Sequence, residues 1–247
     1  RAQRMSEGAF RSPYTEQFVA RLDLSGCATL LDVGCGPGTI ALSVAPSLDH
    51  VYGLDYSEGM LAAFRDQAEI RGLTNATPIR CSWEDDWDDV PVCDIVVASR
   101  ATAVRDFEAA AMKLAGKARR RVYLTYPARG SFVGDEVCRA LGRQYEPLPD
   151  YLCVMGILHH LGIHPRLDYI DDTNRFASCV DVEGFIRKMR DYVGELSEEE
   201  VEILRDYFAR HHSRIAAELM RWAFIWWEAA ASDERSGPAP RRDADHG

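Results

Sequence analysis

A short motif near the N-terminus combines residue types that suit the binding of a small cationic ligand. The segment Leu30–Thr39 reads LLDVGCGPGT, with an acid at the end of an apolar run and glycines at alternate positions. Glycines permit positive φ and let a ligand approach the backbone without a Cβ in the way, and the helix that follows offers unpaired N–H groups. An acid beside such a turn, Asp32 here, favours a ligand that carries positive charge.

The same turn could in principle bind a dinucleotide, and the spacing argues against it. A nicotinamide-binding turn needs the pattern Gly-x-Gly-x-x-Gly. Thr39 occupies the third glycine position of that pattern, and Gly38 stands one residue early. A pyrophosphate also gains nothing from a neighbouring carboxylate, so NAD is not expected to bind.

The pattern Asp-x-Gly-x-Gly-x-Gly resembles the first motif of the class I S-adenosylmethionine-dependent methyltransferases, and the likeness extends over residues 13–126. It implies that S-adenosyl-L-methionine is the cofactor and that the chain is an enzyme. The reaction would be an in-line displacement at the sulfonium methyl group. The cofactor-binding residues that the resemblance implies in this first motif are Asp32, Gly34, Cys35, Gly36 and Gly38.

A second acid stands at the end of the next apolar run. The segment Val51–Asp55 ends with Asp55, and in the family that it resembles an acid at this point binds both ribose hydroxyls. A carboxylate suits that task because its two oxygens accept several hydrogen bonds. The resemblance also implies that Tyr56 and Met60 pack beside the ribose and the adenine.

The segment Cys81–Asp85 corresponds to the family's adenine-binding residues, and it departs from the pattern because Ser82 replaces the usual acid. The contact with the adenine amino group then falls to Ser82, Glu84 or a backbone carbonyl. Trp83 would offer its N–H and a stacking face to the ring. After the fourth apolar run, Ser99 and Arg100 are expected beside the methionine end of the cofactor or beside the acceptor.

No catalytic residue can be assigned from the sequence, although four residues are candidates. A hydroxyl or ammonium acceptor needs a general base, for which Tyr14, His159 and His160 are available. Arg100 could clamp an acceptor carboxylate or phosphate. No metal site is expected, because Gly162 and Pro165 interrupt the histidine-rich segment and nothing nearby completes a ligand set.

The residues after the fourth apolar run bear on the methyl acceptor. Methyltransferases that act on exocyclic amines of bases resemble one another in an Asp/Asn-Pro-Pro-aromatic motif, whereas this chain has Ala98–Ala101, reading ASRA. A Pro-Cys nucleophile for pyrimidine carbon is missing too. We therefore expect a small organic acceptor and no nucleic acid. A protein or RNA acceptor, or a scaffold that binds the cofactor without turnover, remains an alternative.

The elements that would position these residues follow from the hydrophobic pattern. Short apolar runs alternate with helical stretches from Thr29 to Tyr126, which is typical of a parallel sheet covered by helices on both faces. The resemblance implies an α/β, Rossmann-like, mostly parallel sheet of seven strands. Its last strand would be antiparallel, and extra helices would lie between strands six and seven.

The pattern changes after Tyr126. We expect helices over about residues 134–143, 149–162, 182–192 and 197–211, a strand over 167–170, and a final buried strand over 222–227. Ser197 and Glu200 form a capping box. The predicted organisation is an N-terminal arm over residues 1–12, a methyltransferase domain over 13–231 and a mobile tail over 232–247.

Composition narrows the class of protein further. The 247 residues carry a formal net charge of −10, so no global positive field would concentrate nucleic acid or an anionic membrane. No apolar run approaches the roughly 20 residues that span a bilayer. The seven cysteines stand singly, which suggests a reducing cytoplasm. The oligomeric state is left open.

Overall fold

The protein is built on one seven-stranded sheet with the order β3-β2-β1-β4-β5-β7-β6. The computed structural model describes residues 10–102, 104–128, 135–143, 150–173, 176, 179–217 and 219–229. Most of the expected arm over 1–12 and the whole tail over 232–247 lie outside the described residues. The strands are β1 (Thr29–Val33), β2 (His50–Asp55), β3 (Ala76–Arg80), β4 (Cys93–Ala98), β5 (Ala118–Pro127), β6 (Arg166–Thr173) and β7 (Leu219–Glu228).

The direction of the strands confirms the expected topology. Strands β1 to β5 pair in parallel, and β7 pairs antiparallel with both β5 and β6. Six strands therefore run in one direction, and the last strand runs against them. Their shared carboxyl edge is where ligands bind in open sheets of this kind.

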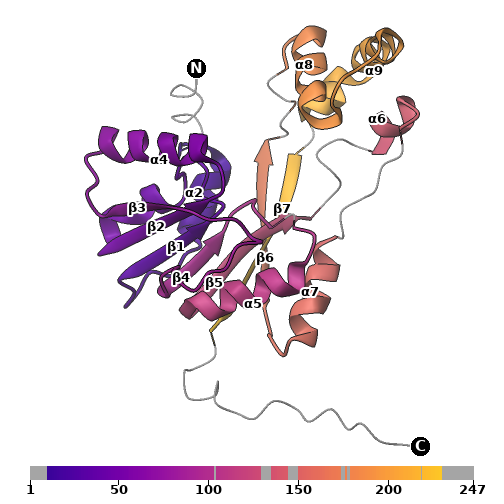
Figure 1. The fold of residues 1–247 in the computed structure, drawn as a ribbon. Helices are drawn as coiled ribbons and strands as arrows, with labels where there is room; N and C mark the ends of the chain where they lie inside the picture. The colour runs from indigo at the N-terminus through magenta and orange to yellow at the C-terminus, as the bar shows by residue number, and fades with distance from the viewer. Residues whose placement is uncertain are drawn as a thin grey trace, which may run out of the picture.

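Helices cover both faces of the sheet, because the buried strands alternate their side chains between two cores. Leu30 packs into one core with α2 (Pro13–Ala20), α3 (Ala41–Val44) and α4 (Glu58–Ile70). Leu31, its neighbour in β1, packs into the other core, on the side of α5 (Phe107–Lys117) and α7 (Tyr151–His160). Figure 1 shows α4 and α5 on opposite faces of the sheet. A short 3-10 turn, η1 (Ala45–Ser47), ends the α3 segment.

Serine side chains cap the starts of two of the helices. Ser12 precedes α2 and accepts a hydrogen bond from the Thr15 N–H at 3.1 Å. Ser57 likewise caps α4, with the N–H of Met60 3.4 Å from its hydroxyl. In each case a hydroxyl satisfies one N–H group that has no partner inside its helix. The two caps hold these helices at the edge where β2 and β4 end.

The inserted helices between β6 and β7 form a separate cap, made of α8 (Val182–Val193) and α9 (Glu198–Ala217) together with the earlier α6 (Asp135–Ala140). These three helices share a core of their own, which includes Val137, Phe185 and Leu204. The capping box at the start of α9 is confirmed, since Ser197 and Glu200 exchange hydrogen bonds of 2.8 and 3.2 Å. Because β6 runs parallel to β5, it ends at the carboxyl edge of the sheet, and α8 and α9 lie beyond that edge (Figure 1).

Strands β6 and β7 are longer than the sequence indicated. The sequence predicts strands over 167–170 and 222–227, whereas the observed strands are Arg166–Thr173 and Leu219–Glu228. Ile170 is level with Trp222 and Pro127, whereas the pairing continues to Thr173 and Leu219, past the end of β5. The extension of β6, Asp171–Thr173, is polar, and that of β7, Leu219–Arg221, pairs only with it, so neither lies in a buried apolar run that predicts a strand. Within the described residues, no helix has the length and apolar character to cross a membrane.

Candidate active site at the carboxyl edge of the sheet

The turn after β1 uses its glycines for two different purposes. All three have positive φ: 67° at Gly34, 52° at Gly36 and 86° at Gly38. A Cβ on Gly34 would lie 2.3 Å from the Cβ of Ala101, and one on Gly38 would lie 2.6 Å from the Phe64 ring. A Cβ on Gly36 would meet nothing within 4 Å. Only Gly36 thus has the open space that we expected beside all three glycines, and the other two are required by packing.

Asp55 joins the turn after β1 to the turn after β2. Its carboxylate is 7% exposed, and Oδ2 accepts the Gly36 N–H at 2.9 Å. Oδ1 accepts the Ser57 N–H, also at 2.9 Å. Each oxygen therefore holds one backbone donor and keeps a lone pair for another. The arrangement fixes the carboxylate at the edge of the open space beside Gly36.

Asp32 is buried without full satisfaction of its carboxylate. It is 1% exposed, and Oδ2 accepts the N–H of Ala41, at the start of α3, at 3.1 Å. Oδ1 has no hydrogen-bond partner among the described residues. Burial, with a smaller contribution from the Asp55 charge, raises the pKa of Asp32 to about 7. A nearby positive charge would therefore stabilise this carboxylate strongly.

Two apolar side chains stand in solvent next to Asp55. Tyr56 is 75% exposed and Met60 is 47% exposed. Exposed aromatic and thioether groups beside a buried acid provide surface on which a flat ring can pack. Their exposure is compatible with the contacts expected to ribose and adenine.

The turn after β3 is closed by its own hydrogen bonds. The Ser82 hydroxyl accepts the N–H groups of Glu84 and Asp85 at 3.2 and 3.3 Å, and Glu84 is exposed. The indole N–H of Trp83 donates to the Ala101 carbonyl at 3.1 Å. It is therefore not free for an adenine ring, contrary to expectation. Trp83 instead joins the turn after β3 to the turn after β4.

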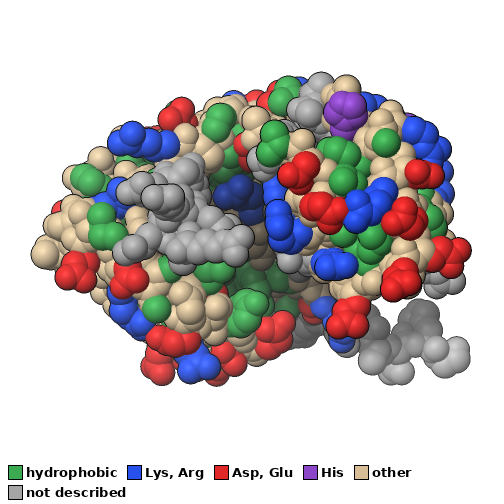
Figure 2. All heavy atoms as spheres, turned by 90° about the horizontal axis from the view of Figure 1, so that it is seen from above, with side chains coloured by type: hydrophobic (Ala, Val, Ile, Leu, Met, Phe, Trp, Pro, Cys, Tyr) green, Lys and Arg blue, Asp and Glu red, His purple; other side chains and the backbone are tan. Residues whose placement is uncertain are grey.

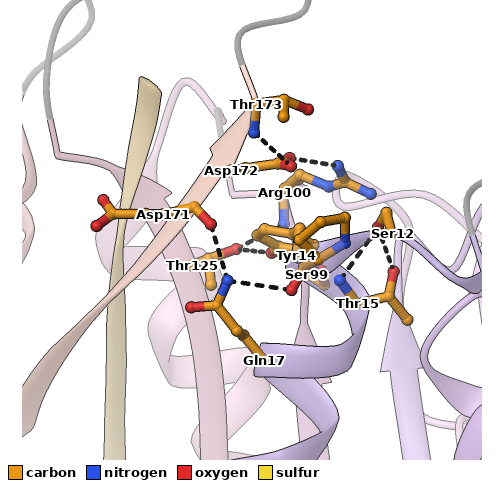
Figure 3. A network of polar contacts seen from close by, with 11 residues as sticks. Ser12, Tyr14, Thr15, Gln17, Ser99, Arg100, Thr125, Asp171, Asp172 and Thr173 are labelled. Atoms are coloured by element: carbon orange, nitrogen blue, oxygen red, sulfur yellow. Dashed lines mark hydrogen bonds and ion pairs between the residues drawn. The ribbon is translucent and has the colours of Figure 1, made fainter. Parts of the chain in front are cut away.

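A buried polar network lies where β4 and β5 end (Figure 3). The Tyr14 hydroxyl, from α2, lies 2.8 Å from the Ser99 Oγ and 2.7 Å from the Thr125 Oγ1. Thr125 also accepts the backbone N–H of Arg100 at 3.0 Å. A hydroxyl within the apolar run of β5 is the one sequence signal for this network. Sequence reasoning nevertheless missed Thr125.

Tyr14 is badly placed to act as a general base. Its side chain is fully buried, and desolvation raises its pKa to about 12 even though the Arg100 charge opposes the shift. At neutral pH the phenol keeps its proton, and both hydrogen-bond partners are themselves hydroxyls. In this geometry its hydroxyl joins Ser99 to Thr125.

Arg100 extends from the same network toward β6. It has φ 57°, the only positive φ on a non-glycine residue among those described, a conformation that costs about 1–2 kcal/mol. Its guanidinium carbon lies 4.1 Å from the centre of the Tyr14 ring. Nη1 lies 3.9 Å from the Oδ2 atom of Asp172 in β6. Asp172 is a further residue that the sequence analysis did not identify.

The structure does not bring His159 and His160 into this arrangement. Both are exposed at the C-terminal end of α7, and the ring of His159 lies 5.5 Å from that of His164. The N-terminal end of α7 is the one near the carboxyl edge, because the Tyr151 hydroxyl lies 2.9 Å from that of Tyr169 in β6. Both histidines lie at the other end of the helix, toward the start of β6.

The turns after β1, β2 and β4 therefore meet at one edge, beside the end of β6. Figure 2 views this end of the molecule from above and shows a hollow with Lys or Arg side chains on its border and hydrophobic side chains deeper inside. One side of the arrangement carries the acids Asp32 and Asp55. The other side carries Arg100 and the buried hydroxyls. An open glycine turn, an unsatisfied buried acid and exposed apolar groups suit a ligand that carries a positive charge and a flat ring.

Known proteins resemble this chain in sequence and in fold. Residues 30–121 match the family model described as a methyltransferase domain. The fold is similar to that of the YcgJ protein from Bacillus subtilis, with a TM-score of 0.59 and 14% identity over 87% of this chain and 97% of that chain. It is also similar to Haemonchus contortus phosphoethanolamine N-methyltransferase 2, with a TM-score of 0.56 and 19% identity over 88% and 53% of the two chains.

The chain belongs to the class I S-adenosylmethionine-dependent methyltransferases. It is an enzyme that uses S-adenosylmethionine for methyl transfer. Along nearly its whole length it is similar to an uncharacterized protein of Haemophilus influenzae, with 34% identity over 92% of this chain and 87% of that protein. A shorter match to an uncharacterized RNA methyltransferase of Listeria innocua has 36% identity over 62 residues, which cover 25% of this chain and 14% of that protein.

Proposed function

We propose that this methyltransferase acts on a small organic acceptor, which binds at the carboxyl edge between the ends of β4 and β6. The observation that carries the proposal is the position of Arg100, a partly buried guanidinium supported by the Tyr14 ring and facing Asp172. One such cation orients a small acid or phosphate well. An RNA backbone requires many.

The cofactor half of the proposal assigns a role to each residue at the turns. Asp55 would bind the ribose hydroxyls with its free lone pairs, and Gly36 would let the cofactor approach the backbone. Tyr56 and Met60 would pack on the adenine, whose edge would meet the turn of Ser82, Trp83 and Glu84. The buried carboxylate of Asp32 would stabilise the positive charge of the methionine end. Gly34, Cys35 and Gly38 would shape the turn, and Ser99 would lie beside the methionine end.

The bound cofactor supplies a methyl group that is already activated on a positively charged sulfur. The protein's contribution is then to align the acceptor with that carbon and to keep water out, effects worth up to about 7–11 kcal/mol. Tyr14 and Thr125 act on this alignment through hydrogen bonds, because they fix the turn that carries Ser99 and Arg100. No described side chain needs to ionise for this role.

Two further observations support a small acceptor. The net charge of −10 opposes sequence-independent attraction to RNA or DNA. The H. contortus neighbour was crystallised with phosphomonomethylethanolamine, a small molecule. The short match to the L. innocua RNA methyltransferase covers 14% of that protein, too little to bear on its acceptor.

The test uses S-adenosylmethionine with a labelled methyl group and a cell extract divided by size. We expect the enzyme to transfer label to molecules that pass a small-pore filter. Label in nuclease-sensitive or protease-sensitive material would contradict the small-acceptor proposal. Cofactor binding without any transfer would favour a scaffold that does not turn over.

A further inference from the structure

The acidic side chains of β6 differ in how closely they are paired. Asp168 lies 2.8 Å from Arg21, and Asp171 forms two hydrogen bonds of 2.7 and 2.8 Å to Arg221. Asp172 has no partner this close among the described side chains. Its Oδ1 accepts the N–H of Thr173 at 2.8 Å, while Oδ2 lies 3.9 Å from Arg100 and accepts no hydrogen bond from a described residue.

The backbone of Arg100 is fixed by its neighbours, whereas the hydrogen-bond donors of its side chain are not used by them. Its backbone N–H is bound by Thr125, and the Tyr14 ring lies against its guanidinium carbon. No described residue accepts a hydrogen bond from its side chain, which is 33% exposed, whereas that of Asp172 is 14% exposed. Two partly desolvated charges that face each other without a hydrogen bond keep much of their capacity for a ligand.

We infer that Asp172 and Arg100 together recognise a zwitterionic acceptor, one that carries an ammonium group and an acidic group on the same small molecule. The inference rests on the small-molecule acceptor proposed above. Asp172 would accept N–H bonds from the ammonium, and Arg100 would bind the carboxylate or phosphate. Figure 3 shows the two side chains approaching each other from the end of β4 and the end of β6.

The two charges also set a specificity. An acceptor with only an acidic group would place a second negative charge near Asp172, and an acceptor with only an ammonium would face Arg100. A neutral acceptor would replace the water around both charges without supplying an opposite charge to either. A zwitterion avoids all three penalties, and selection of this kind depends on the repulsive contacts as much as on the attractive ones.

The first experiment measures the charge of the product. The full-length enzyme is incubated with methyl-labelled S-adenosylmethionine and the small-molecule fraction of a cell extract, and the labelled product is separated by electrophoresis at several pH values. We expect a product with both an amine or ammonium and an acidic group. A small product with one charge or none would overturn the zwitterion inference alone. Label in macromolecules, or in no fraction, would contradict the proposed function itself.

The second experiment compares two neighbouring acids with the acceptor found in this way. Asp172→Asn should raise the acceptor KM by about 10-fold to 100-fold, the loss expected from one charge-assisted contact. The KM for S-adenosylmethionine and kcat should change by no more than a few-fold. Asp171→Asn is the matched control, since it breaks the ion pair to Arg221 one residue away and should leave the acceptor KM unchanged.

A purely structural role for Asp172 would give a different result. It would lower the melting temperature of Asp172→Asn and would leave acceptor selectivity intact. If Asp172→Asn does not fold, the wild-type enzyme still decides the question through the acceptor and its deaminated analogue. Affinities of these two compounds that differ by less than about threefold, measured by calorimetry with S-adenosylhomocysteine bound, would overturn the inference.

Discussion

The two halves of the site are assembled in different ways. On the cofactor side, Asp55 reaches Gly36 and Ser57 through turns that follow neighbouring parallel strands. On the acceptor side, Tyr14 contacts Thr125 across 111 positions of the chain, and Arg100 meets Asp172 from a strand at the far edge of the sheet. The first half is specified by local patterns. The second exists only once β5, β7 and β6 have been placed.

Substitutions of the glycines in the turn after β1 should have the largest effects. They distinguish a loss of cofactor binding from a loss of stability. Gly36→Val should abolish cofactor binding while the protein still folds, because the new side chain fills open space. Gly38→Val should instead unfold the protein or lower its melting temperature sharply, since a Cβ there lies 2.6 Å from the Phe64 ring. Calorimetry with S-adenosylhomocysteine and thermal melts would measure the two effects.

Gly72→Val is the control for backbone strain. Gly72 has a positive φ of 65° and open space around its position, as Gly36 does with its φ of 52°. Gly72 follows the C-terminal end of α4, away from the turn after β2. The strain should cost about 1–2 kcal/mol in either variant. Normal cofactor affinity in Gly36→Val, or equal loss of affinity in Gly72→Val, would remove the assignment of Gly36 to the cofactor site.

The next effect concerns the carboxylate that joins the two turns. Asp55→Ala should weaken cofactor binding by about 10-fold to 100-fold, since charge-assisted hydrogen bonds contribute about 1.5–3 kcal/mol. Asp66→Ala, an exposed acid on α4, should leave the affinity unchanged. Equal affinities of the wild-type and Asp55→Ala proteins in calorimetry would refute the ribose assignment.

The sequence predicted the cofactor half well for a physical reason. Asp32 is the penultimate residue of β1 and Asp55 is the last residue of β2, and the glycine turn follows β1 directly, so short-range patterns define both the strands and the turns. The polar end of β6 gave no such signal, and neither did Asp172 within it. The Trp83 N–H was assigned to a ligand because the neighbouring Ala101 carbonyl comes from another turn. Its position depends on the finished sheet.

The stability of the protein should depend on pH, with an effect of intermediate size, through the ionisation of Asp32. Its folded-state pKa of about 7 lies above the ordinary value of 3.8, so the folded state keeps a proton that the unfolded state loses. The stability of the unliganded protein should therefore fall as pH rises from about 4 to about 7 and then level off. Asp32→Asn should flatten that part of the profile in thermal melts.

Cofactor affinity should show the opposite trend over the same range. A positively charged ligand favours the carboxylate form, so binding of S-adenosylmethionine should tighten as pH rises toward 7 and should release a proton. Calorimetry in two buffers of different ionisation enthalpy would detect the proton. Absence of proton release at pH 6, with wild-type behaviour in Asp32→Asn, would contradict this linkage.

The smallest effect is expected from Tyr14→Phe, and it tests how the acceptor half is organised. A general base would contribute about 10²-fold to 10⁴-fold to the rate. A buried phenol whose pKa is raised to about 12 should instead act through its hydrogen bonds to Ser99 and Thr125. Removing the hydroxyl should lower stability by about 1–3 kcal/mol, because it leaves the Thr125 hydroxyl with one partner fewer. Methyl transfer should fall only a few-fold, with an unchanged pH profile. A loss of 100-fold or more together with the disappearance of a basic limb from the profile would make Tyr14 the proton acceptor, whereas a small loss with an intact profile assigns it to holding the turn that carries Ser99 and Arg100.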